Sequence, residues 1–98
     1  MKRQFFLKLR APRPTFMLDM TADEKLIMQN HVAYWTNLLD AGTAIVFGPV
    51  FEPTGGYGIG VVSVESEDRL KEIIANDPAN GLNTYEYYPM KAIFGQNP

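Results

Sequence analysis

The sequence predicts an α+β domain in which two helices cover one face of a four-stranded antiparallel sheet. A length of 98 residues suffices for one hydrophobic core and one domain, which we expect to span residues 1–98. Hydrophobic residues make up 46% of the chain and charged residues 20%, a balance typical of folded proteins. The spacing of hydrophobic residues alternates between a period of about 2, typical of strands, and one of about 3.6, typical of helices. These alternations give the order βαββαβ.

The first strand is predicted over residues 3–10, where apolar and polar side chains alternate. Phe5, Leu7 and Leu9 share one face of this strand. Two prolines follow within four residues, and because proline lacks a backbone donor they end the strand. An irregular loop is expected as far as Met20.

The first helix begins with a capping box, in which Thr21 and Glu24 can each satisfy the backbone N–H of the other. One side of this helix is apolar and the opposite side is polar. The predicted buried arc consists of Ile27, Met28, His31, Val32, Tyr34, Trp35, Leu38 and Leu39. Gly42 supplies the left-handed residue that commonly ends a helix.

The second and third strands are predicted over Ala44–Phe51 and Tyr57–Glu65. The loop between them contains two consecutive glycines, which tolerate the backbone angles of a hairpin. We therefore expect these strands to pair in the antiparallel direction.

The second helix is capped by Ser66 and runs from Glu67 to about Asn76. Pro78 disfavours helical geometry at the preceding residue and ends it. A last strand, rich in tyrosine, is predicted over Thr84–Phe94.

The order βαββαβ is typical of a ferredoxin-like sandwich with both helices on one face of the sheet. Pro49 in the second strand and Pro89 in the fourth cannot donate to a ladder, so those strands are expected at the edges. The first and third strands are then central, which gives the spatial order 4-1-3-2.

The sheet face without helices is also predicted to be apolar, because it would carry Phe6, Tyr88, Met90 and Phe94. An uncovered apolar face is typical of an interaction surface. We therefore expect a homodimer in which two sheets pack face to face.

Charge and composition exclude several classes of function. Nine basic against eleven acidic residues give a net charge of -2, which argues against nucleic acid and anionic membranes as partners. The glycines of residues 56–60 resemble the core of an RNA-recognition motif, but Gly55, Ile59 and Val62 occupy the places of its basic and stacking residues. With one histidine and no cysteine, neither a metal nor another cofactor is expected.

The absence of cysteine is consistent with a reducing compartment, and no signal peptide or membrane-spanning stretch is predicted. We therefore expect a cytoplasmic protein.

His31 and Asp77 are the candidate catalytic residues. His31, the single histidine, falls within the apolar arc of the first helix, where it is either a hydrogen-bonded core residue or a group that transfers protons. Asp77 stands at a helix C-terminus, where the helix dipole disfavours a carboxylate. It either forms an Asx turn or balances a nearby imidazolium, and an Asp-His pair can orient a general base.

Several residues follow one another at characteristic intervals: His31, Gly42, the Gly48-Pro49 pair, the Asp77-Pro78 pair and the Tyr85-Glu86 pair. Their order and spacing resemble the YciI-like (YCII-related) family of small bacterial proteins. The resemblance implies a dimeric α+β barrel and a His-Asp active-site pair, which falls on His31 and Asp77. Two positions depart from the family pattern: Ala92 stands where a proline is common, and Ala79 where an aromatic residue is common.

The resulting hypothesis is a cofactor-independent enzyme that performs acid-base chemistry of the lyase, dehydrohalogenase or isomerase type. Its substrate would be a small molecule, aromatic or quinone-like in character. Gly48, Pro49, Tyr34 and Trp35 are predicted to shape the substrate pocket. The alternative is a sensor or accessory protein that uses the same cleft only to bind a small ligand.

Overall fold

The computed structural model describes residues 1–95 and places four strands and two long helices where the sequence predicts them. The elements in chain order are β1 (Arg3–Arg10), α1 (Phe16–Asp19), α2 (Ala22–Asp40), β2 (Ala44–Val50), β3 (Tyr57–Val64), α3 (Glu67–Asn76) and β4 (Thr84–Met90). The predicted α+β class and the order of the long elements are confirmed. No helix formed by residues 1–95 is long and apolar enough to cross a membrane.

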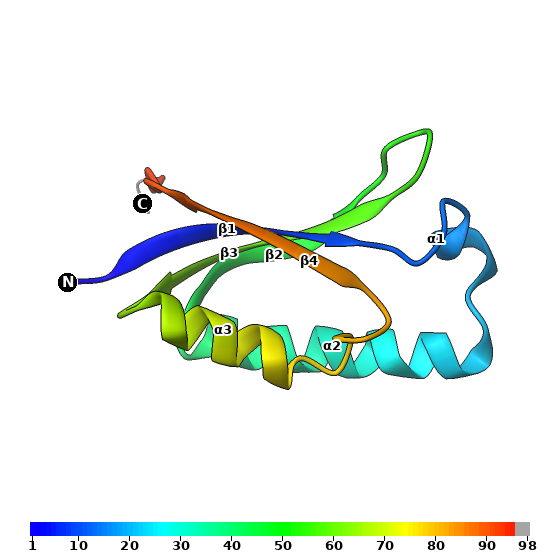
Figure 1. The fold of residues 1–98 in the computed structure, drawn as a ribbon, viewed down its shortest axis with the longest axis horizontal. Helices are drawn as coiled ribbons and strands as arrows, with labels where there is room; N and C mark the ends of the chain where they lie inside the picture. Colours follow the sequence, from blue (N-terminus) through cyan, green and yellow to red (C-terminus); the bar gives the residue numbers. More distant parts are fainter. Residues whose placement is uncertain (96–98) are drawn as a thin grey trace.

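All neighbouring strands are antiparallel, and their order is β2-β3-β1-β4, which is 4-1-3-2 read from the other edge. Pro49 and Pro89 therefore lie in the two edge strands, as their missing backbone donors predict. Figure 1 shows α2 and α3 together on one side of the sheet. The opposite side carries no helix.

The core lies between the sheet and the two long helices. Phe5, Leu7 and Leu9 of β1 are buried and face Trp35 and Leu70, while the side chains between them on the strand are less buried. Alternate burial of this kind is the direct consequence of the two-residue period of a strand.

The helix-free face of the sheet carries one apolar side chain from each strand in a single row. Phe6 pairs with Val61 on one side and with Tyr88 on the other, and Val61 pairs with Val46. Val46 and Tyr88 are exposed. An apolar row on this face is consistent with the predicted second hydrophobic surface.

Helix α2 begins with the predicted capping box, and Gly42 beyond its end has a φ of 77°, in the left-handed region. Its buried stripe is narrower than predicted: His31, Trp35 and Leu38 are buried, whereas Val32 and Leu39 are exposed. A helix resting on only one surface buries a stripe, and the flanks of an apolar arc stay in contact with solvent.

The structure shortens three predicted strands and adds one helix. β2 ends at Val50 and β3 at Val64, each one residue earlier than predicted. The last strand ends at Met90 rather than at Phe94, because the final pair of its ladder joins Met90 to Gln4 near the beginning of β1. Residues 16–19 form the short helix α1 instead of irregular loop. A single turn has no measurable periodicity, and burial of Phe16 stabilises this one.

Candidate active site

His31 and Asp77 lie in contact although 46 residues separate them in the sequence. His31 projects from the middle of α2, and Asp77 is the residue at which α3 ends. The Nδ1 atom of His31 is 2.9 Å from one carboxylate oxygen of Asp77 and 3.0 Å from the other. The two candidates are therefore brought together by the packing of α2 beside the end of α3.

Asp77 accepts two further hydrogen bonds, from the indole N–H of Trp35 at 2.7 Å and from the backbone N–H of Ala79 at 2.9 Å. The second of these is the Asx turn expected as one alternative for Asp77, and the contact with His31 places an imidazole beside the same carboxylate. Burial alone would raise the pKa of Asp77, but the bonds from His31, Ala79 and Trp35 outweigh it and hold the pKa below its usual value. The carboxylate is therefore charged at neutral pH, and its three donors offset the unfavourable position of this charge at a helix C-terminus.

This contact fixes the tautomer of neutral His31. A carboxylate accepts hydrogen bonds, so Nδ1 carries the proton and Nε2 keeps the lone pair. Nε2 has no hydrogen-bond partner among residues 1–95. His31 also forms part of a cavity wall, so its ring borders space that a ligand can occupy.

The cavity beside His31 has a volume of about 300 Å³ and lies between α1, the middle of α2 and the neighbouring strands β2 and β3. Three lining side chains carry a polar atom, and none carries a formal charge when His31 is neutral. The lining residues are Leu9, Ala11, Phe16, Met17, Met20, Met28, His31, Val32, Phe47, Gly48, Pro49, Phe51, Tyr57, Gly58, Ile59 and Asn83. Such a wall favours an uncharged, largely apolar ligand.

Of the four residues predicted to shape the pocket, the structure places two at the cavity wall. Gly48 and Pro49 line it, but Tyr34 and Trp35 do not. The hydroxyl of Tyr34 donates to the carbonyl of Ile73 at 2.8 Å. Trp35 is 1% exposed, since its ring is covered by the sheet. Both lie on the buried side of α2, and Trp35 supports Asp77 instead of contacting a ligand.

Gly60 makes room for the indole of Trp35. A Cβ atom at this position would lie 2.7 Å from the ring, closer than atoms in proteins approach without displacement. Gly60 of the central strand β3 thus allows the close approach of an aromatic side chain. The orientation of the Asp77 carboxylate thus depends on a glycine in the opposite layer.

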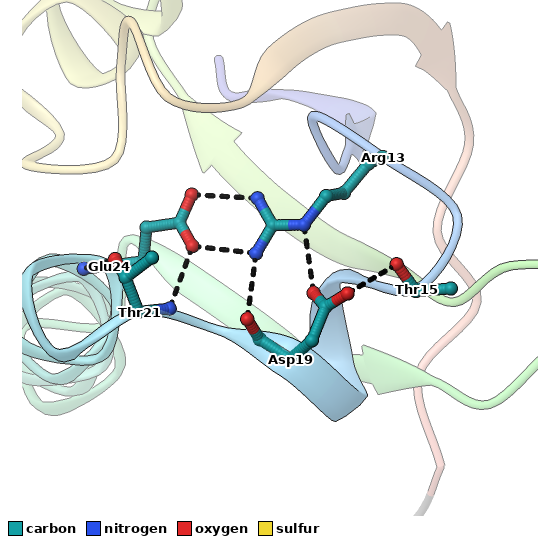
Figure 2. A network of polar contacts seen from close by, with 5 residues as sticks. All are labelled: Arg13, Thr15, Asp19, Thr21 and Glu24. Carbon is teal, nitrogen blue, oxygen red and sulfur yellow. Dashed lines mark hydrogen bonds and ion pairs between the residues drawn. The ribbon is translucent and has the colours of Figure 1, made fainter.

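A network centred on Arg13 holds α1 over the start of α2 (Figure 2). Arg13 donates to Asp19 at 2.8 Å and, through its two terminal nitrogens, to the Glu24 carboxylate at 2.9 and 2.7 Å. The hydrogen bonds from Arg13 and from the backbone of Thr21 lower the pKa of Glu24 to about 2. Because α1 supplies Phe16 and Met17 to the cavity, this network fixes one of its walls.

Three features of the site escape sequence reasoning. The sequence gives no sign that methionines from α1 and α2 gather at one cavity, or that Asn83 reaches its wall. Tyr85 is the third: its hydroxyl is buried without a hydrogen-bond partner among residues 1–95, and burial together with the Asp77 carboxylate raises its pKa. A loop asparagine and a strand tyrosine look ordinary until the chain is folded.

Comparison with known proteins identifies the family. The family model of the YCII-related domain matches residues 5–93. The chain belongs to the YCII-related domain family. The resemblance seen in the spacing of His31, Gly48, Pro49 and Asp77 is therefore confirmed at the level of the family.

One solved structure of the same fold is 5-chloro-2-hydroxyhydroquinone dehydrochlorinase (TftG) from Burkholderia phenoliruptrix AC1100, in complex with 2,5-dihydroxybenzoquinone. It is 20% identical to this YCII-related chain and superposes with a TM-score of 0.59, covering 89% of this chain and 93% of its own. This likeness confirms the fold. No curated protein sequence matches the chain.

Proposed function

We propose that this YCII-related protein is a cofactor-independent enzyme in which His31 transfers a proton on a small aromatic or quinone-like molecule. The observation that carries the proposal is the hydrogen bond from His31 Nδ1 to Asp77 at the wall of an apolar cavity. In such an arrangement the carboxylate orients the ring and stabilises the imidazolium that forms when Nε2 accepts a proton.

The proton would come from a C–H or O–H group of the bound molecule and would return from Nε2 to another atom of it. An isomerisation needs only this transfer. An elimination also expels a leaving group with its bonding electrons, so that the proton and the leaving group depart together. Both reactions fit a cavity in which His31 is the single imidazole and no carboxylate is found among the lining residues.

The size and chemistry of the cavity support an aromatic substrate. An apolar cavity of about 150 Å³ accommodates benzene in another protein, so about 300 Å³ leaves room for one substituted ring. The ligand in complex with TftG, 2,5-dihydroxybenzoquinone, is such a ring, and that protein is a dehydrochlorinase. We propose that this chain also acts on a substituted ring, and we name no particular substrate.

Replacing His31 tests the proposal. Halogenated hydroquinones and hydroxybenzoquinones would be incubated with the protein and followed by their ultraviolet absorbance and by released halide. We expect His31→Ala to lower turnover at least a hundredfold, since a general base contributes about 10²–10⁴-fold, while circular dichroism and the melting temperature show an intact fold. Gln29→Ala, an exposed position of the same helix, is the matched control.

A fold that collapses in His31→Ala, or turnover that is unchanged, contradicts the catalytic role. The first result assigns His31 to the core, and the second assigns the chemistry to another group.

A second candidate function is ligand binding without chemistry. Many acid-base enzymes use two residues, each a histidine or a carboxylic acid. The residues that line this cavity include only one such residue, His31, which favours binding without chemistry. Under this alternative the same compounds raise the melting temperature but are recovered unchanged. Analysis of the compounds after incubation separates the two functions.

We also propose that two copies associate through the helix-free face of the sheet. The row formed by Val46, Val61, Phe6 and Tyr88 supports this, because it places an apolar side chain of every strand on one uncovered surface. A second copy would bury this row against its own.

A further inference from the structure

The side chain of Asn83 belongs to the cavity wall and has no role in the proton transfer proposed for His31. Asn83 lies in the loop between α3 and β4, is 7% exposed and lines the same cavity as His31. Its amide nitrogen is 3.6 Å from the sulfur of Met28, and its amide oxygen is buried without a hydrogen-bond partner among residues 1–95. The amide is thus a polar group at an apolar wall with most of its hydrogen-bonding capacity unused.

The local backbone does not explain an asparagine here. Asparagine is favoured in turns because it tolerates a positive φ, but no residue other than glycine has a positive φ within residues 1–95. The backbone N–H of Asn83 donates to the carbonyl of Ala79, a bond that any residue except proline could form. The reason for a polar side chain must therefore lie in the cavity.

The contact with Met28 favours the amide orientation seen here. Sulfur is a weak acceptor, so the amide N–H faces it, whereas the reverse orientation would bring two acceptors together. A ligand hydroxyl group can both donate and accept, and it can pair with whichever part of the amide the bound ring faces. A methyl group of the same size can do neither.

We propose that Asn83 determines specificity by binding a hydroxyl group on the ring that occupies the cavity. The inference rests on the proposed function for the ring itself, and it adds the substituent that the ring must carry. The ligand class is an uncharged hydroxylated aromatic molecule, with one edge at His31 and a hydroxyl group at Asn83. A carboxylated ring is disfavoured, because no Lys or Arg lines the cavity.

Isosteric probes test the assignment. Catechol, resorcinol and hydroquinone would each be compared with the methylphenol in which one hydroxyl is replaced by methyl, and dissociation constants would be measured by calorimetry. For the isomer that binds best, we expect wild-type protein to prefer the hydroxyl compound about three- to tenfold. Asn83→Leu should reverse this order, because an apolar wall favours the methyl group.

Asn37→Leu makes the same substitution at an exposed position of α2 and should keep the wild-type preference. Should Asn83→Leu not fold, Asn83→Ala serves in its place and should also lose the preference. The inference is overturned if the folded Asn83 variant keeps the wild-type preference for the hydroxyl compound. It is also overturned if the wild-type protein binds none of the six compounds or prefers the methylphenols.

Failure of the Asn83 inference can be distinguished from failure of the proposed enzymatic function. His31→Ala should keep the hydroxyl preference while losing turnover, so a protein without chemistry can still show an effect of Asn83. A merely structural role for Asn83 predicts a lower melting temperature in Asn83→Leu with the hydroxyl preference retained, and this result would overturn the inference.

Discussion

At the scale of single residues, the site depends on Asp77 remaining charged although its side chain is inaccessible to solvent. The side chain has a solvent-accessible fraction of 0%, and three donors surround it: His31 and Trp35 on neighbouring turns of α2, and the backbone of Ala79. A buried ion pair adds little net stability to a fold. Removing one partner leaves an unpaired buried charge, which destabilises the fold by much more. Asp77 therefore links the proposed catalysis to the stability of the fold.

Replacing Asp77 by Asn should expose this link. Trp35 and Ala79 donate to different oxygens of Asp77, so an asparagine, with one oxygen, can keep only one of these bonds. A neutral amide also does not stabilise an imidazolium. We expect turnover to fall at least a hundredfold, nearly as far as in His31→Ala, and the double variant to lose little more, because the two residues act as one unit. Effects that simply multiply in the double variant would contradict the pairing.

The same residue predicts a pH dependence of stability. The folded-state pKa of Asp77 is lowered, so its contribution is complete above the unfolded value of about 3.9 and is lost as the pH falls through the lower folded value. Denaturant midpoints measured between pH 7 and pH 2 should decline below about pH 4. The decline should be smaller in Asp77→Asn. Equal declines in both proteins would show that other carboxylates dominate acid unfolding.

At the scale of secondary-structure elements, contact between the sheet and α2 positions the carboxylate. The indole of Trp35 lies against Gly60 of β3 and donates to Asp77, so the spacing of two layers decides the orientation of a polar group. Phe47 of β2 lies 5.8 Å from the indole, measured between ring centroids.

Adding one methyl group at Gly60 tests this arrangement. We expect Gly60→Ala to destabilise the fold by about 1–3 kcal/mol, because the new Cβ would overlap a buried ring. Trp35 is the single tryptophan, so a shift in its fluorescence emission would report its displacement. In Gly58→Ala the nearest atom would lie at 3.5 Å, an ordinary contact, and this variant is the control. Equal stability of the two variants would contradict the account.

Helix α1 illustrates how an element can form without a sequence signal. Its four residues carry no periodic pattern, yet Phe16 is buried and the ion pairs of Arg13 fix the segment to Glu24 at the start of α2 (Figure 2). The lowered pKa of Glu24 shows the strength of that connection. The Arg13 network thereby maintains the wall that separates the cavity from solvent on this side.

At the scale of the whole molecule, the two faces of the sheet differ in what covers them. The helices bury one face, and the row of Val46, Val61, Phe6 and Tyr88 lies on the other. Among residues 1–95, Figure 1 shows no other helix or strand over this second face.

A charge on this row should separate the proposed dimer. We expect Tyr88→Glu to convert a dimer into a monomer in sedimentation velocity at micromolar concentration, because burying an unpaired carboxylate between two sheets is unfavourable. Leu26→Glu places the same charge on an exposed position of α2 and should leave the dimer intact. A monomeric mass for the unmodified protein would remove the proposal.

The sequence by itself determined the order of the long elements, the edge positions of β2 and β4 and the two ends of α2. These depend on local chemistry: alternation in Phe5, Leu7 and Leu9, the missing donors of Pro49 and Pro89, the capping box of Thr21 and the left-handed Gly42. The spacing of His31 and Asp77 suggested a pair only through resemblance to a family, because no local rule joins residues so far apart.

Tertiary structure alone decided which side chains meet. It assigned Trp35 to Asp77 instead of the cavity wall, brought Asn83 to that wall and folded residues 16–19 into a turn. The physical reason is that a helical or strand pattern records which face a side chain occupies, whereas its partner depends on how layers from distant parts of the chain pack together.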